Sequence, residues 1–176
     1  MRALMVGLLL AVPALAADVE SGPEKGAKVP ALKVFTATGD NEKKTVDYPG
    51  TFKEKPTLYF FVNAEKFSRQ MNQFMKKIDT KVSEDFKGVK AVAVWLTEDE
   101  DKTKKRLAAI QMSVNYEMPL TLFKGKEGPK GWNVNSDAHL TVVLAHKGKV
   151  VAKFGYNSVN GEDAPAVLKE LKKHAK

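Results

Sequence analysis

Residues 58–82 read LYFFVNAEKFSRQMNQFMKKIDTKV, and this stretch decides the expected fold. Its first five residues, 58–62, are apolar without alternation, which is typical of a strand covered on both faces of a sheet. Apolar residues then recur at helical spacings over four turns, which predicts an amphipathic helix. These residues are Phe67, Met71, Phe74, Met75, Ile78 and Val82. We expect the helix to begin near Ala64, with Asn63 as its N-cap.

The alternation of strand and helix continues along the chain. Residues 91–96 and 120–123 are further uninterrupted apolar runs, and an amphipathic pattern lies between them. Strands that alternate with helices pair in parallel through right-handed crossovers, so these two strands and 58–62 should lie parallel in one sheet. A hairpin around Gly148 and a last helix follow. The sequence predicts an α/β fold, a three-layer sandwich with a mixed central sheet and helices on both faces.

The N-terminus has the order of a secretory signal peptide. Arg2 is followed by an apolar run and then by Ala14-Leu15-Ala16, a small-x-small cleavage pattern. The apolar run is shorter than the roughly 20 residues that cross a bilayer, so we expect cleavage. An uncleaved anchor, or a mature start shifted by one residue at Ala17, stays open.

The sequence divides into three parts. We assign 1–16 to the signal peptide, 17–28 to a flexible lead-in with Gly22-Pro23 and Gly26, and 29–176 to one folded domain. No later segment is apolar for long enough to span a membrane. We therefore expect a mature chain without a transmembrane segment, located in the periplasm or outside the cell.

Charge and cysteine content limit the classes of function that the protein can have. The 176 residues carry a formal net charge of +8 and include no cysteine, so the protein cannot perform thiol redox chemistry with its own side chains. An anionic partner is plausible. After the expected signal peptide, however, the only arginines are Arg69 and Arg106. Lysine lacks the bidentate fork that reads bases and phosphates, so we expect no specific nucleic-acid recognition.

Three segments resemble the thioredoxin-like superfamily, in particular its exported thiol-disulfide oxidoreductase and peroxiredoxin-related branch. Residues 26–32, GAKVPAL, resemble the entry segment of that branch, and 58–62 resemble the strand that leads to its active site. Residues 141–151, TVVLAHKGKVV, resemble its closing hairpin. The resemblance covers roughly 26–174, and it implies a thioredoxin-like fold.

Two hallmarks of that superfamily are absent from the sequence. The family's chemistry depends on a CxxC pair or a peroxidatic cysteine at the start of the first long helix, where the helix end lowers the thiol pKa. The pair would fall near Lys66 and Arg69, and a peroxidatic cysteine near Gln70. The family's cis-proline would fall at His139. None of these positions holds the family's residue.

Lys66, Arg69 and His139 are the candidate ligand-binding residues. Two cations beside the free N–H groups of a helix start suit an anion or a carboxylate. The alternative is that Lys66 and Arg69 simply point into solvent. We identify no catalytic residue, no metal-ligand spacing and no cofactor motif among the three histidines and the serines.

Two classes of function remain from the sequence. The first is a redox-inactive thioredoxin-like domain of the cell envelope that binds a protein, a peptide or an anion. The second is an oxidoreductase-family protein that acts without its own thiol or with the cysteine of a partner. The intact hydrophobic pattern without cysteines favours the first class and a protein that is not an enzyme.

Overall fold

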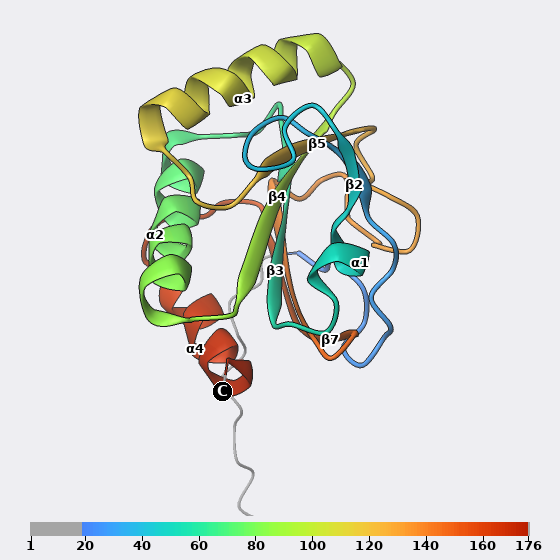
Figure 1. The fold of residues 1–176 in the computed structure, drawn as a ribbon, viewed down its shortest axis with the longest axis vertical. Coiled ribbons are helices and arrows are strands. Elements are labelled where there is room, and N and C mark those ends of the chain that lie inside the picture. The colour runs from blue at the N-terminus through green and yellow to red at the C-terminus, as the bar shows by residue number, and fades with distance from the viewer. Residues whose placement is uncertain (1–18, 176) are drawn as a thin grey trace, which may run out of the picture.

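The computed structural model describes residues 19–175, so the predicted signal peptide at 1–16 lies outside the described residues (Figure 1). No helix in the described part is both long and apolar enough to cross a bilayer. The elements are β1 (Lys33–Thr36), β2 (Thr45–Asp47), α1 (Tyr48–Phe52), β3 (Thr57–Asn63), α2 (Arg69–Asp85), β4 (Lys90–Thr97), α3 (Glu100–Val114), β5 (Leu120–Lys124), β6 (Leu140–His146), β7 (Lys149–Tyr156) and α4 (Ala164–His174).

One mixed sheet organises the chain. Its strand order is β2-β1-β5-β4-β3-β6-β7. β3 pairs in parallel with β4, and β4 with β5, which confirms the predicted parallel core. β6 pairs antiparallel with β3 and with β7, which confirms the closing hairpin. β3 is therefore an interior strand, as its uninterrupted apolar sequence requires.

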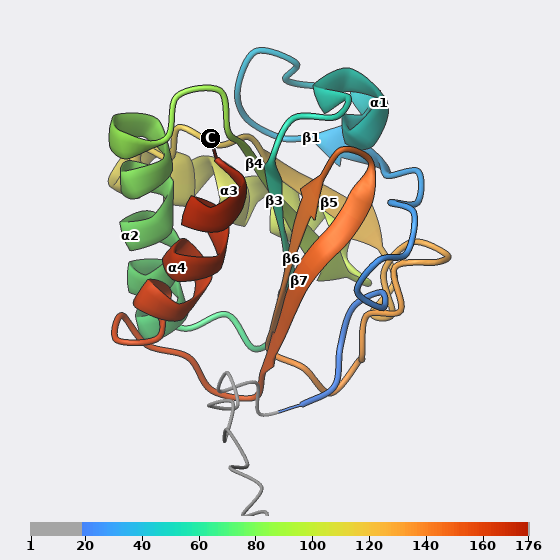
Figure 2. The same cartoon turned by 90° about the horizontal axis from the view of Figure 1, so that it is seen from below.

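The two faces of the sheet carry separate cores. Leu58, Phe60 and Val62 point to the face covered by α2, α3 and α4, whereas Tyr59 and Phe61 point to the other face. That second face is covered by α1, the N-terminal segment and the loop before β6, with Trp132 fully buried (Figure 2). Helices thus lie on both faces, as predicted, but the three long ones share one face because β3, α2, β4, α3 and β5 advance in one direction across the sheet.

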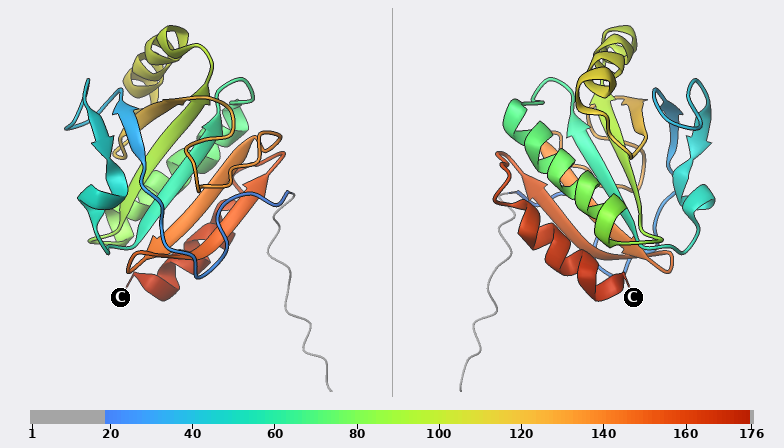
Figure 3. Two further views of the ribbon diagram at one scale, coloured as in Figure 1. Left: turned by 90° about the vertical axis from the view of Figure 1, so that its right-hand side faces the viewer. Right: turned by 60° about the vertical axis from the view of Figure 1, so that its left-hand side comes forward.

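Residues 19–28 lie along the free edge of β7 (Figure 3). Val19 N donates to Gly155 O at 3.3 Å, and Gly26 N donates to Val150 O at 2.8 Å. The buried Ser21 hydroxyl lies 2.6 Å from the hydroxyl of Thr141. Residues 19–28 thus contact both β7 and β6 in the structure.

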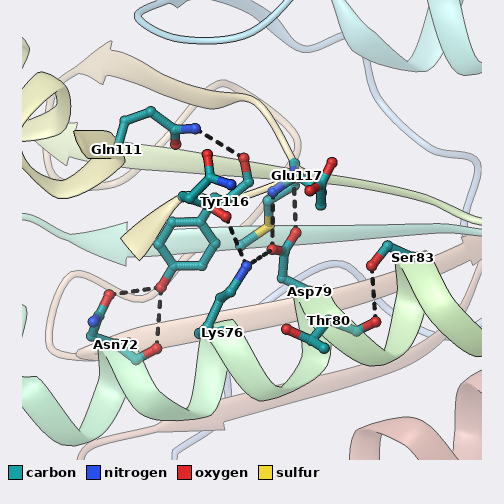
Figure 4. A network of polar contacts seen from close by, with 10 residues as sticks. Asn72, Lys76, Asp79, Thr80, Ser83, Gln111, Tyr116 and Glu117 are labelled. Carbon is teal, nitrogen blue, oxygen red and sulfur yellow. Dashed lines mark hydrogen bonds and ion pairs between the residues drawn. The ribbon is translucent and has the colours of Figure 1, made fainter. Parts of the chain in front are cut away.

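A polar network attaches α2 to the connection between α3 and β5 (Figure 4). The buried carboxylate of Asp79 accepts hydrogen bonds from Glu117 N at 3.0 Å, Met118 N at 2.9 Å and Lys76 Nζ at 3.1 Å. The Tyr116 hydroxyl donates to Asn72 Oδ1 at 2.7 Å. Each donor would be costly to bury alone, so the network fixes the position of α2 against the sheet.

Candidate functional site

The connection between β3 and α2 begins with a turn rather than with helix. Asn63 Oδ1 accepts a hydrogen bond from Glu65 N at 3.1 Å, and Lys66 N donates to Asn63 O at 3.1 Å. The helix begins five residues later than predicted, at Arg69, and its N-cap is Ser68 rather than Asn63. The physical reason is that the Asn63 side chain closes a local turn, while Ser68 Oγ accepts from Met71 N at 3.1 Å.

Arg106 of α3 holds this connection in place. Its guanidinium donates to Ala64 O at 2.7 Å and to Phe67 O at 3.4 Å. The guanidinium carbon also lies 5.1 Å from the centre of the Phe67 ring, which in turn lies 5.5 Å from the ring of the buried Trp95. The planar fork of arginine suits two carbonyl oxygens and an aromatic face at once. The connection is thereby fixed from the side of α3.

His139 lies beside the end of β3. Its carbonyl accepts from Asn63 N at 3.0 Å, and its N–H donates to Tyr156 O at 2.8 Å. Asn63 Nδ2 also donates to Ser136 O at 3.4 Å, so the loop before β6 meets the loop before α2. The structure therefore brings the His139 backbone to the end of β3, on the approach to α2. The peptide bonds of the described residues are all trans, including the one that precedes His139.

The start of α2 is cationic and open to solvent. Lys66 and Arg69 are exposed, and within residues 19–175 their side chains have no hydrogen-bond or ion-pair partner. No acidic residue lies in the first turn of α2. The N–H groups of Arg69 and Gln70 likewise find no acceptor in this part of the chain. Free donors and two free cations at a helix end favour an anion there.

Two further charged residues adjoin this start. Glu65 is exposed and pairs with Lys126 at 3.1 Å, so its negative charge is offset by a lysine from the loop after β5. We call Lys66, Arg69, His139 and the N–H groups of Arg69 and Gln70 the α2-start site. Within residues 19–175, no hydrogen bond or ion pair joins the side chains of Lys66, Arg69 and His139, and only the backbone of His139 is tied to the end of β3.

The α2-start site combines two cationic side chains with free backbone N–H donors. Among residues 19–175, no group of three His, Cys, Asp or Glu side chains is placed to hold a metal ion. The side chains present supply positive charge and hydrogen-bond donors but no thiol nucleophile. Such a set can hold a carboxylate or another small anion.

Comparison with solved structures identifies the fold class of the chain. No family model and no curated protein matches the sequence. Solved structures do match, among them a putative thiol:disulfide interchange protein DsbE from Chlorobium tepidum, at a TM-score of 0.62 and 19% identity over 88% of this chain and 99% of that one. The fold is thioredoxin-like. Peroxidoxin BcpB from Mycobacterium tuberculosis also matches, at a TM-score of 0.61 and 15% identity over 86% of this chain and 97% of that one.

A third similar structure is an uncharacterized conserved protein from Geobacillus kaustophilus, with a TM-score of 0.66 and 14% identity over 89% of this chain and 87% of that one.

On this thioredoxin-like fold, Lys66 lies in the connection before α2 and Arg69 is the first helical residue. The sequence indicated both positions but not Arg106 or Lys126. Arg106 carried one usable signal, as one of only two arginines after the predicted signal peptide.

Proposed function

We propose that the protein is a redox-inactive thioredoxin-like binding domain of the cell envelope, and that it binds carboxylate-bearing peptides or protein segments at the α2-start site. The observation that carries the proposal is the chemistry at the start of α2. Where the thioredoxin-like superfamily would place thiols, this chain has two free cations, Lys66 and Arg69, beside unpaired backbone donors.

The rigid support of this surface favours recognition. Arg106 and Ser68 fix the connection before α2 from two sides, so little order has to be gained when a ligand binds. Charge contacts at an exposed helix end are each worth about 0.3–1 kcal/mol and weaken with salt. A physiological partner must therefore add contacts of its own to neighbouring surface.

Location in the envelope follows from the predicted signal peptide. We expect the mature protein to begin at Ala17 or Asp18 and to be recovered outside the cytoplasm. An intact-mass measurement on the protein from its host decides this part of the proposal. Recovery of the whole 176-residue chain from membranes would contradict it.

The binding proposal is tested with peptides that end in a free carboxylate and with the same peptides amidated. The Lys66→Ala, Arg69→Ala double variant should bind the carboxylate form about 3- to 30-fold more weakly, because two charge contacts are lost. The matched control is Lys33→Ala, Lys44→Ala, which removes two exposed lysines from the β1–β2 edge. The difference between the variants should shrink as salt rises from low to moderate concentration.

Equal affinity of wild type and the Lys66→Ala, Arg69→Ala variant would refute the assignment of the site. Equal affinity for carboxylate and amidated peptides would refute the assignment of the ligand class.

A further inference from the structure

A cavity lies at the opposite end of β3 from the α2-start site. The last residue of β3, Asn63, lies beside the α2-start site. The first residue, Thr57, lies about 20 Å from Asn63 at the usual rise of a strand. Near the beginning of β3, this cavity of about 250 Å³ is enclosed by α1, the turn of the β6–β7 hairpin and the chain that enters β1. Its lining residues are Lys28, Val29, Pro49, Gly50, Lys53, Glu54, Lys55, Tyr59, Ala145 and Gly148. We call this cavity the lysine-rimmed pocket.

The floor of the pocket is apolar and its rim is cationic. Tyr59 and Ala145 are buried, and Val29 is half-buried beside them. Lys28, Lys53 and Lys55 are exposed, and none of their ammonium groups has an ion-pair partner within the described chain. Burial raises the pKa of the Tyr59 hydroxyl, so this group stays neutral and adds no negative charge to the floor.

Backbone conformation at the rim is unfavourable for the residues that are there. Lys53 has φ 58° and ψ −132°, a region that glycine adopts readily and other residues rarely. Lys147, whose N–H donates to Glu54 O at 3.0 Å, has φ 52°. This conformation is not confined to the rim, since Lys43 in the β1–β2 turn has φ 64° and does not line the pocket.

We infer that the lysine-rimmed pocket binds a small organic anion with a compact apolar body, such as an aromatic or short-chain carboxylate. The apolar body would lie on Tyr59, Ala145 and Val29, and the anionic group would face the lysines. The cavity is at the small end of ligand pockets, which limits the body to about one ring or a short acyl chain. Glu54 is the only acid in the lining, and it opposes this binding.

The probes are benzoate, the neutral benzyl alcohol and inorganic phosphate, each titrated into the isotope-labelled protein and followed by amide NMR shifts. Benzoate should shift the amides of residues 53–55, 59 and 145–149 and bind more tightly than either other probe. Benzyl alcohol lacks the charge, and phosphate lacks the apolar body. Equal shifts with phosphate would reduce the pocket to a general anion surface and overturn the inference.

The Lys53→Gly variant distinguishes an effect on ligand binding from an effect on folding stability. This variant should raise the melting temperature, because glycine relieves the backbone, and should weaken benzoate binding about 2- to 5-fold, because one ammonium is lost. Lys43→Gly is the matched control, since Lys43 is an exposed lysine with φ 64° in the β1–β2 turn. It should stabilise the fold in the same way and leave benzoate affinity unchanged.

Lys55→Gln should weaken benzoate binding by a similar factor, and Glu54→Gln should strengthen it. Unchanged affinity in both Lys53→Gly and Lys55→Gln, or shifts confined to other residues, would overturn the inference. The Lys66→Ala, Arg69→Ala variant should keep full benzoate affinity at this pocket, so failure here and failure of the α2-start site give different results.

Discussion

At the scale of single residues, Arg106 fixes the connection between β3 and α2 on which the candidate site depends. Its guanidinium bonds two carbonyl oxygens of the connection before α2 and packs on Phe67. No other contact from α3 to this connection has comparable geometry among those described. The other contacts that hold the connection are the turn closed by Asn63, the Ser68 cap, the bond from Ala64 N to Leu96 O at 3.1 Å and the Glu65–Lys126 ion pair.

Arg106→Ala should therefore loosen the connection more than it destabilises the domain. We expect a loss of about 1 kcal/mol in the free energy of unfolding, because the side chain is largely exposed. Hydrogen exchange at residues 64–68 should accelerate clearly. Lys105→Ala, the neighbouring exposed lysine, should change neither quantity, and unchanged exchange in Arg106→Ala would show that the connection is rigid for another reason.

Asp79 is the residue on which the packing of α2 most depends. Only 2% of it is exposed, and its carboxylate accepts two backbone N–H groups and the Lys76 ammonium. Asp79→Ala should lower the free energy of unfolding by about 3 kcal/mol, since it leaves buried donors unpaired. Asp85→Ala on the same helix removes an exposed acid and should cost less than about 0.5 kcal/mol. Similar losses in the two variants, measured by urea unfolding, would contradict this role.

At the scale of elements, the N-terminal segment covers the edge of β7 with a few backbone bonds and does not form a regular strand. Gly155 of β7 makes this approach possible, because a Cβ at this position would lie 2.1 Å from Val19 O. The segment also brings Ser21 into the interior beside Thr141. The sheet thus has its β7 edge covered by chain that precedes the first regular strand.

Gly155→Ala should displace the start of the N-terminal segment. We expect a loss of about 1–3 kcal/mol in the free energy of unfolding, together with faster hydrogen exchange at residues 19–22. Gly161→Ala is the control, because a Cβ there meets no atom within 4 Å. If Gly155→Ala left exchange at 19–22 unchanged, the segment would not be held by its approach to β7.

Sequence periodicity predicted β3 and α2 because both carry apolar residues at the spacing of their own secondary structure. It placed the start of α2 too early because Asn63 and Ser68 are both good N-caps, and only tertiary contacts decide between them. It missed Arg106 because a bond from α3 to a distant carbonyl leaves no local pattern. The lysine-rimmed pocket was equally hidden, since its lysines come from separate parts of the chain.

At the scale of the whole molecule, the burial of tyrosines makes the free energy of unfolding depend on pH in the alkaline range. Burial raises the pKa of Tyr116, with a further contribution from the charge of Asp79, and burial also raises the pKa of Tyr59 and Tyr48. A raised pKa in the folded state gives stability that is complete below the unfolded value of about 10 and is lost as pH rises toward the folded value.

The free energy of unfolding should therefore fall as pH rises above about 10. Tyr116→Phe should be less stable at neutral pH, because its bonds to Asn72 are lost, but its stability should fall less steeply, by up to about 1.4 kcal/mol per pH unit. Urea unfolding of both proteins from pH 8 to 11.5 measures the slopes. Equal slopes would mean that Tyr116 does not contribute to the alkaline loss.

The central claim is that a thioredoxin-like fold without cysteine binds carboxylates at the α2-start site. The most direct measurement is an amide NMR titration of the labelled protein with a carboxylate-terminated peptide at low salt. We predict saturable shifts centred on residues 64–70 and 139, absent with the amidated peptide and reduced in the Lys66→Ala, Arg69→Ala variant. Saturable shifts located elsewhere, or no shifts in the wild type, would contradict the claim.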